Sequence, residues 1–159
     1  MISIRNLSKA FPIADGKIAA LKNLDLEVAE GDFFVIVGAS GSGKTTLLRC
    51  VAGLESPDGG EIRIAGRPVF ADHPPTWVPP QERHFGMVFQ SYAVWPHLTV
   101  FENVALPLRE GTHKIPRAEV NGRVCEALRM VQLDEQKDRS ATLLSGGQQQ
   151  RGALARAIA

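Results

Sequence analysis

The spacing of hydrophobic residues divides the chain into a part rich in strands followed by a part rich in helices. Apolar and polar residues alternate over 2–4, 24–28 and 61–64, which is the period of strands with one exposed face. A continuous apolar run over 33–37, bounded by glycines, predicts a strand buried on both faces, as in a parallel sheet. A further short strand is predicted at 86–89.

A helical period appears in several later segments. Apolar residues at helical spacing predict a helix over 43–51, and Thr99 with Glu102 forms a capping box at the start of another. Pro116 opens a further helix, whose apolar stripe consists of Val120, Val124, Leu128 and Val131. Half of the ten prolines fall within 68–80, which predicts a loop or insertion there and not a core element.

The composition is that of an ordinary globular chain of 159 residues, with 44% hydrophobic and 22% charged residues, which excludes a disordered or collagen-like protein. No apolar run approaches the roughly 20 residues of a membrane span, and the first residues lack a secretory signal, so we expect a soluble, cytoplasmic chain. The 18 basic and 17 acidic residues nearly cancel, which argues against a nucleic-acid partner. Cys50 and Cys125 lack metal-ligand spacing and are expected to be free thiols.

Residues 38–45 read GASGSGKT and match the phosphate-binding pattern G-x-x-x-x-G-K-[ST]. A predicted strand precedes them and a predicted helix follows, which is the context the motif requires. Glycines let successive N–H groups turn toward phosphate oxygens, and the helix start adds the positive end of its dipole. Lys44 can reach the β- and γ-phosphates, Thr45 can ligate Mg²⁺, and Thr46 is expected to touch the α-phosphate. The motif predicts binding of a nucleoside triphosphate with Mg²⁺.

A second motif, LSGGQ, occupies 144–148. Ser145 and Gln148 have the spacing of a capping box that opens a helix running through Arg156. Gly146 and Gly147 would each cost about 1 kcal/mol of helix stability relative to alanine, so capping alone does not explain them. A helix start with bare amides would instead let a phosphate approach closely.

The two motifs together resemble those of the nucleotide-binding subunit of ABC transporters, and the 101 positions from Lys44 to Ser145 are similar to that family's spacing. The resemblance implies an α/β fold: a P-loop NTPase core with an N-terminal antiparallel β subdomain and an inserted helical subdomain, incomplete at the C-terminus. It implies a β subdomain with the phosphate-loop core at 1–90, a helical subdomain at 91–143, and the signature motif with the start of its helix at 144–159.

The resemblance also implies roles for individual residues. In the family, two subunits dimerise head to tail and hold ATP between the phosphate loop of one and the LSGGQ helix of the other. Gln90 falls at the catalytic Q-loop glutamine, and Phe11 falls where an aromatic ring stacks on adenine. The residues expected to bind ATP are Phe11, Gly38, Ala39, Ser40, Gly41, Ser42, Gly43, Lys44, Thr45, Thr46, Ser145, Gly146, Gly147 and Gln148, and those expected to bind Mg²⁺ are Thr45 and Gln90.

The segment after Gln90 bears on the partners. Residues 91–98 fall where subunits of the family contact the coupling helices of membrane-spanning permease subunits. The amino-acid sequence here is similar to that of importers for ferric iron, polyamines, phosphonates or sugars. We therefore expect an import ATPase subunit on the cytoplasmic face of the inner membrane. Its expected partners are a second nucleotide-binding subunit, permease subunits and a substrate-binding protein, with no nucleic acid.

The chain departs from the family pattern after the signature. The family places a Mg²⁺-binding aspartate and a catalytic glutamate on the next strand and a histidine further on, whereas no acidic residue follows Asp138 here. A general base must lie within hydrogen-bond reach of its water, so we expect a C-terminally truncated fragment with negligible ATPase activity. A missing core strand would leave the predicted strand at 33–37 without a neighbour, so we also expect poor solubility. Smaller departures are Ala141, Leu143 and Gly152.

Three other interpretations use the same motifs differently. A GTPase or small-molecule kinase could carry the phosphate loop, but the guanine-reading N-K-x-D motif is absent and LSGGQ has no role there. A non-transport ABC protein acting on nucleic acid or ribosomes usually has two cassettes or a long coiled-coil insertion, and the charge balance disfavours it. A binding-only remnant would bind nucleotide without turnover.

Overall fold

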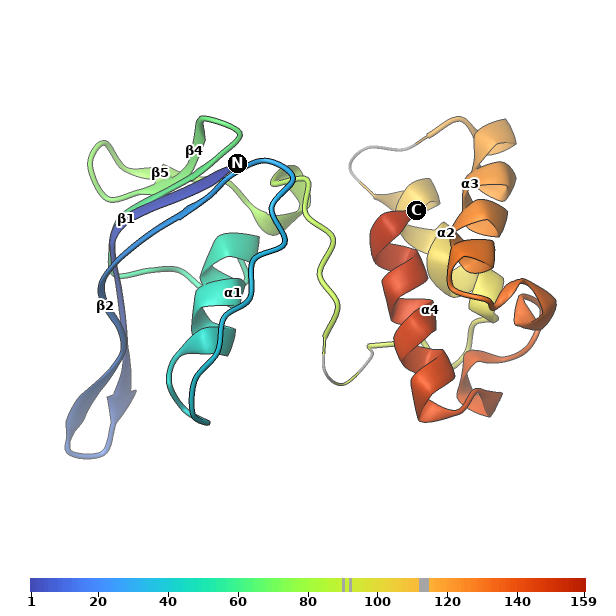
Figure 1. Cartoon of the computed structure of the whole chain (residues 1–159), viewed down its shortest axis with the longest axis horizontal. Coiled ribbons are helices and arrows are strands. Elements are labelled where there is room, and N and C mark those ends of the chain that lie inside the picture. Colours follow the sequence, from blue (N-terminus) through green and yellow to red (C-terminus); the bar gives the residue numbers. More distant parts are fainter. Residues whose placement is uncertain (90, 92, 112–114) are drawn as a thin grey trace. The chain divides into compact units, whose positions relative to one another are not determined.

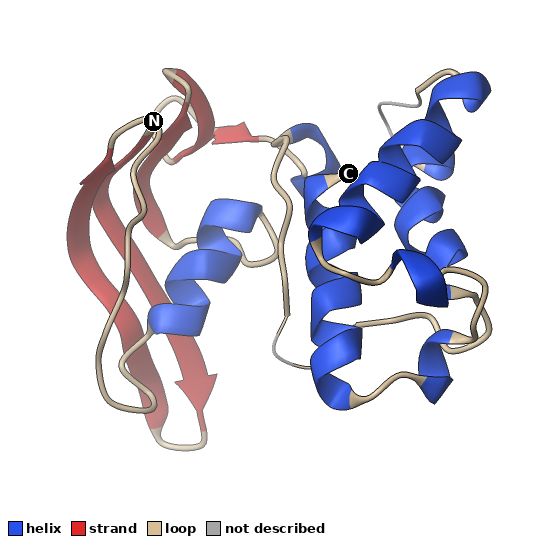
Figure 2. Ribbon diagram, turned by 45° about the vertical axis from the view of Figure 1, so that its right-hand side comes forward, coloured by secondary structure: helices blue, strands red, loops and turns tan. Residues whose placement is uncertain are grey.

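A computed structural model describes residues 1–89, 91, 93–111 and 115–159. The chain folds into two compact units, Met1–His84 and Phe85–Ala159, and each has its own hydrophobic core. Strands are found in the first unit and most helices in the second (Figures 1 and 2). This order is the one that the hydrophobic pattern predicts.

The first unit is built on a five-stranded antiparallel sheet with the order β2-β1-β3-β4-β5 (Figure 1). The long hairpin of β1 and β2 turns at Ala14 and Asp15, where the sequence carries turn residues. Its strands are much longer than the alternating segments that predict them. The strands are β1 (Ile2–Ile13), β2 (Gly16–Val28), β3 (Gly59–Ile64), β4 (Arg67–Ala71) and β5 (Thr76–Trp77).

Helix α1 (Lys44–Ala52) packs on one face of this sheet, which confirms the helix predicted at 43–51 (Figure 2). Its buried residues Leu47, Cys50 and Val51 share a core with apolar residues of four strands: Ile4 and Leu7 of β1, Leu21 of β2, Ile62 of β3, and Val69 and Phe70 of β4. Burying such side chains stabilises the unit by about 1.5–3 kcal/mol for each large residue. The packing fixes the start of α1, where the phosphate motif lies, on the sheet.

Arg83 closes the same core from the C-terminal side of α1. It follows the short 3₁₀ helix η1 (Pro80–Glu82) and is only 2% exposed. Its guanidinium donates to the carbonyls of Cys50 and Val51, at 2.9 and 3.0 Å, in the last turn of α1. The carbonyl of Cys50 also accepts from the amide of Gly53 at 3.1 Å, so Arg83 adds to the C-terminal cap of α1 and places a positive charge at the negative end of the helix.

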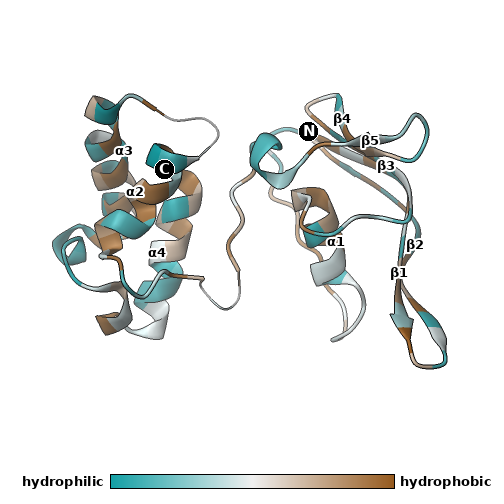
Figure 3. Ribbon diagram, turned by 180° about the vertical axis from the view of Figure 1, so that it is seen from behind, coloured by the Kyte–Doolittle hydropathy of each residue, from teal (hydrophilic) through white to brown (hydrophobic). Residues whose placement is uncertain are grey.

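The second unit is a bundle of α2 (Val100–Glu110), α3 (Arg117–Met130) and α4 (Gly146–Ile158). Two 3₁₀ turns, η2 (Asp134–Gln136) and η3 (Ala141–Leu143), connect α3 to α4. All three helices contribute to one core, and the brown, hydrophobic stretches along them are visible in Figure 3. The predicted stripe is confirmed, since Val120, Val124, Leu128 and Val131 are all buried.

Two predictions about strands are wrong. Residues 33–37 and the described residues 86–89 belong to no strand, and Phe33 is 95% exposed although the pattern predicts burial on both faces. A strand requires a hydrogen-bonded neighbour, and within the part of the chain that the structure describes no strand pairs with either segment.

A third prediction fails in the proline-rich segment 68–80. It contains β5 and most of β4, and Val69, Phe70 and Ala71 are buried. Pro68 lies at a register shift between β3 and β4, where its missing N–H is tolerated, and the remaining prolines flank β5. Proline density therefore marks the ends of these strands and does not exclude them.

Candidate nucleotide site

The phosphate motif forms a tight loop that leads directly into α1. Gly43 is the residue before the helix and has a φ of +88°, in the left-handed region that favours glycine. A Cβ atom at this position would collide with the carbonyl oxygen of Ala20 in β2. The last glycine of the motif is thus required both for its backbone angle and for the close approach of the loop to β2.

The side chain of Lys44 folds back over this loop. Its Nζ donates to the carbonyls of Gly38 and Ala39, at 2.8 and 2.6 Å, and contacts Oγ of Ser42 at 3.3 Å. The ammonium therefore lies against the turn whose amides the motif assigns to phosphate. No side chain caps the start of α1 and its first turn holds no acidic residue, so nothing there competes with an anion for the positive end of the helix.

Thr45 is exposed in the first turn of α1, and Thr46 beside it is partly exposed. Among the described residues there is no cluster of three or more His, Cys, Asp or Glu side chains that could hold a metal ion. Mg²⁺ beside nucleotides is commonly held by one or two protein oxygens with phosphate and water, and the exposed Thr45 hydroxyl is an oxygen of this kind.

Phe11 lies on the hairpin next to this loop. It stands opposite Ile18 in the register of β1 and β2, two residues along β2 from Ala20, whose carbonyl meets Gly43. The ring is partly exposed, and the ammonium of Lys9 lies 5.2 Å from its centre. The first unit thus brings the predicted aromatic platform near the predicted phosphate loop.

The signature motif starts α4 in the second unit as the capping box predicts. The amide of Ser145 donates to Oε1 of Gln148 at 2.9 Å, and the amide of Gln148 donates to Oγ of Ser145 at 3.4 Å. Gly146 and Gly147 are exposed, and a Cβ atom at Gly147 would meet nothing within 4 Å. The start of α4 is accordingly open to a ligand.

Gln90 and Tyr92 lie outside the described residues, but the rest of 91–98 is tied to the bundle. Asn103 of α2 is buried, accepts from the amide of Trp95 at 2.7 Å and donates to the carbonyls of Trp95, Leu98 and Thr99. Arg156 of α4 donates to the carbonyl of Ala93 at 2.7 Å and lies over the ring of Trp95 at 4.7 Å. Two helices therefore fix the segment that is expected to face the permease.

Sequence reasoning did not find Asn103, Gln149 or Arg156 as positioning residues. Gln149 donates to the carbonyls of Ala141 and Leu144 and so holds the approach to the signature. The available signal was a polar residue inside an apolar stripe, as with Asn103 between Val100 and Val104. Such a residue is buried only when it is hydrogen-bonded, which makes it a candidate for fixing a loop.

Comparison with known protein families matches residues 21–159 to the ABC transporter family. The chain belongs to this family. It is 49% identical over 158 residues to the spermidine/putrescine import ATP-binding protein PotA of Aggregatibacter actinomycetemcomitans and 45% identical over 157 residues to PotA of Thermobifida fusca. Each match covers 99% of this chain and 39% of the relative, so the chain spans about two fifths of the length of these relatives.

Solved structures give the same fold. The dimeric structure of MJ0796, a bacterial ABC transporter cassette, matches with a TM-score of 0.85 and 36% identity, over 99% of this chain and 69% of the cassette. A second structure of MJ0796, in a post-hydrolysis state bound to ADP and Pi, matches equally well. The ABC cassette fold predicted from the two motifs is thereby confirmed. No helix among the described residues is both long and apolar enough to cross a bilayer.

Proposed function

We propose that this chain forms the nucleotide-binding part of an ABC import ATPase subunit and that it binds ATP with Mg²⁺ at residues 38–46. The single observation that carries the proposal is the loop in which Lys44 lies against Gly38 and Ala39 at the uncapped start of α1. The cation and the positive end of the helix dipole together match a polyphosphate. The structure of MJ0796 with ADP and Pi supports a nucleotide as the ligand.

The remaining site residues complete the proposed reaction cycle. Phe11 stacks on adenine, Thr45 and Gln90 contact Mg²⁺, and Gln90 helps to position the attacking water. The open start of α4 at 145–148 contacts the γ-phosphate held by a second nucleotide-binding subunit, in a head-to-tail dimer. The dimeric cassette MJ0796 supports this partner. ATP binding closes the dimer and hydrolysis reopens it.

The proposed cargo is a polyamine. PotA relatives at 45–49% identity over nearly the whole chain support spermidine or putrescine over the other importer substrates. We propose that residues 91–98 pass the motion of the cassette to permease subunits at the cytoplasmic face of the membrane, with a substrate-binding protein outside. The cassette subdivision into 1–90, 91–143 and 144–159 belongs to the same proposal.

Nucleotide binding is tested by titrating the 159-residue chain with a fluorescent ATP analogue in the presence of Mg²⁺. The substitution Lys44→Ala removes charge-assisted hydrogen bonds to phosphate and is expected to weaken binding roughly tenfold or more. Lys22→Ala, at an exposed lysine of β2, is the matched control and should bind like the wild type. Equal binding by the wild type and Lys44→Ala would refute the assigned site.

Hydrolysis is tested separately. Since residues 139–159 hold no Asp or Glu side chain, we expect this 159-residue chain to bind ATP with negligible turnover. Steady phosphate release at the rate of intact cassettes would show that another residue of this chain acts as the base.

A further inference from the structure

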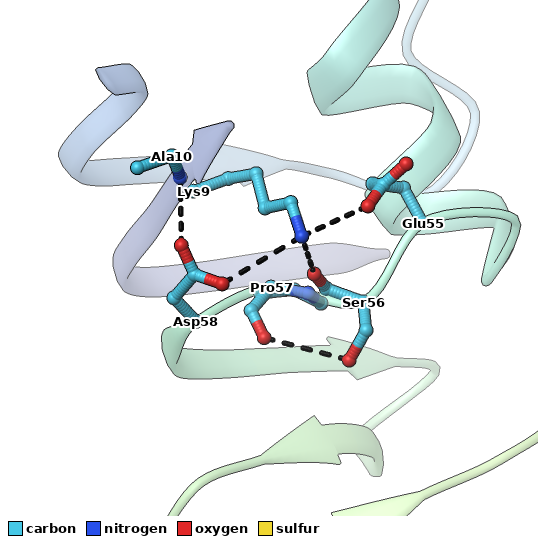
Figure 4. A network of polar contacts seen from close by, with 6 residues as sticks. All are labelled: Lys9, Ala10, Glu55, Ser56, Pro57 and Asp58. Carbon is cyan, nitrogen blue, oxygen red and sulfur yellow. Dashed lines mark hydrogen bonds and ion pairs between the residues drawn. The ribbon is translucent and has the colours of Figure 1, made fainter. Parts of the chain in front are cut away.

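Lys9 is the centre of a polar network that joins β1 to the segment following α1 (Figure 4). Its Nζ lies 2.8 Å from Oε1 of Glu55, 3.6 Å from Oδ1 of Asp58, and donates to the carbonyl of Ser56 at 2.7 Å. The side chain is only 12% exposed. The hydrogen bond with Glu55 raises the pKa of Lys9, so the ammonium stays charged at neutral pH.

Asp58 also holds the main chain of β1. Its Oδ2 accepts from the amide of Ala10 at 2.7 Å, and its own amide donates to the carbonyl of Ser8 at 2.8 Å. The residues on both sides of Lys9 are thus fixed to the turn before β3. Exposed single ion pairs contribute little, but this set combines two carboxylates, a carbonyl and two main-chain bonds around one lysine, with Asp58 itself exposed.

The fourth side of the Lys9 ammonium is occupied by the ring of Phe11, 5.2 Å away. A cation at this distance from a ring centre is attracted to the ring face, so Lys9 covers one face of Phe11 and restrains the rotation of its ring. Phe11 remains partly exposed and lies on the hairpin that approaches the phosphate loop at Gly43.

We infer that Lys9 is a positioning residue for the base of the nucleotide: it holds the Phe11 ring so that a purine stacks on the face that Lys9 leaves open. The inference rests on the proposed function. Because Glu55 and Asp58 follow α1, the same network links the base platform to the far end of the helix that binds phosphate. Lys9 acts through Phe11 and does not touch the phosphates.

The test compares two ligands that share phosphates and differ in the base. Isothermal titration of the whole 159-residue chain measures the affinity for MgATP and for inorganic tripolyphosphate with Mg²⁺. Lys9→Met should weaken MgATP binding roughly fivefold, the size of one weak cation–π contact, and leave tripolyphosphate binding unchanged. Lys9→Arg, which keeps the cation, should restore MgATP binding. Lys17→Met, at an exposed lysine of the same hairpin, should change neither affinity.

Three outcomes would overturn the inference. An unchanged MgATP affinity in Lys9→Met would show that the ring needs no support, and an equal loss for both ligands would show a general structural role. In a Phe11→Leu background, Lys9→Met should have no further effect on MgATP binding, so an undiminished effect there would show that Lys9 does not act through the ring. If Lys9→Met does not fold, Glu55→Gln replaces it, with a smaller loss expected for MgATP alone.

The result for the wild type separates this inference from the proposed function. A wild-type chain that binds neither ligand would refute the nucleotide site as a whole. If the wild-type chain binds both ligands and the Lys9→Met variant gives one of the three contrary outcomes, only the role of Lys9 is refuted.

Discussion

Burial gives the two cysteines of this chain different chemistry. Cys50 lies in the core between α1 and the sheet, and this burial raises the pKa of its thiol to about 11. Cys125 is partly exposed on α3, where its thiol faces Oδ1 of Asn121. Only the thiolate is nucleophilic, so Cys50 reacts slowly for two reasons: few of its thiols are ionised, and the surrounding side chains block access by a reagent.

We expect a disulfide reagent at pH 8 to label one thiol rapidly in the folded chain and both after unfolding. At a pKa near 11, about one Cys50 side chain in a thousand is ionised at pH 8. Absorbance of the released thiol counts the modified residues, and Cys125→Ser should abolish the rapid phase. Rapid labelling of two thiols in the folded wild type would show that the core around Cys50 opens readily.

Local sequence spacing could predict some functional residues and not others. Ser145 and Gln148 act on backbone groups three positions away, so their pairing could be predicted from the sequence. Arg83 binds the carbonyl of Cys50, 33 residues earlier, and that partner is decided by packing of the whole unit. The polar residues that hold loops across the fold are therefore those that sequence patterns miss.

At the scale of elements, the capping box of α2 depends on ionisation. Oε2 of Glu102 accepts from the amide and the hydroxyl of Thr99 at 2.8 and 3.0 Å, and the amide of Glu102 donates to Oγ1 of Thr99. The hydrogen bond from the Thr99 amide, followed by that from its hydroxyl, lowers the pKa of Glu102. The charged form of Glu102 is favoured in the folded state, so the capping box contributes fully to stability at pH values above the ordinary pKa of a glutamate.

We expect Glu102→Gln to be less stable than the wild type at pH 7 and to approach it as the pH falls. The variant keeps an acceptor and loses the negative charge at the helix start. The wild type loses its advantage as the pH drops through the lowered pKa of Glu102, because the folded carboxylate then becomes protonated. Urea unfolding of both proteins between pH 7 and pH 3 measures the difference. A difference that stays constant over this range would contradict a charge-based cap.

The helices were predictable and several strands were not, for a physical reason. The stripe of α3 carries its own 3.6-residue period, and the backbone hydrogen bonds of a helix are internal to it. The run at 33–37 has strong strand propensity but would need hydrogen bonds from a neighbouring strand, and β4 has three buried residues in a proline-rich segment that reads as a loop. A strand is a property of its neighbours as much as of its own sequence.

At the scale of the whole molecule, the predicted nucleotide residues fall in both units. The phosphate loop and Phe11 belong to Met1–His84, whereas the signature belongs to Phe85–Ala159. Each motif could be recognised from its local spacing and each is formed within one unit. The sequence alone supplied no signal for the Lys9 network, because it joins β1 to residues 47 and 48 positions further along the chain.

Most of the hydrophobic segment 33–37 is exposed, and only Ile36 of the five packs against the core of the first unit. Phe33 and Val37 are 95% and 85% exposed, and the run between them pairs with no strand in the part of the chain that the structure describes. An uncovered apolar segment with unpaired backbone groups is a template for pairing with another copy. The segment is uncharged from Phe33 to Val37, so no like-charge repulsion opposes this association.

We therefore expect this chain to self-associate at high concentration, and the double substitution Phe33→Lys and Val35→Lys to reduce association. Two added charges on a five-residue apolar segment repel a second copy and keep the segment in water. Sedimentation velocity over a hundredfold range of concentration measures the effect. Leu143→Lys, which changes an exposed apolar residue of η3 outside any extended run, is the control and should associate like the wild type. A wild type that stays monomeric throughout the range would show that the apolar segment is covered within its own chain.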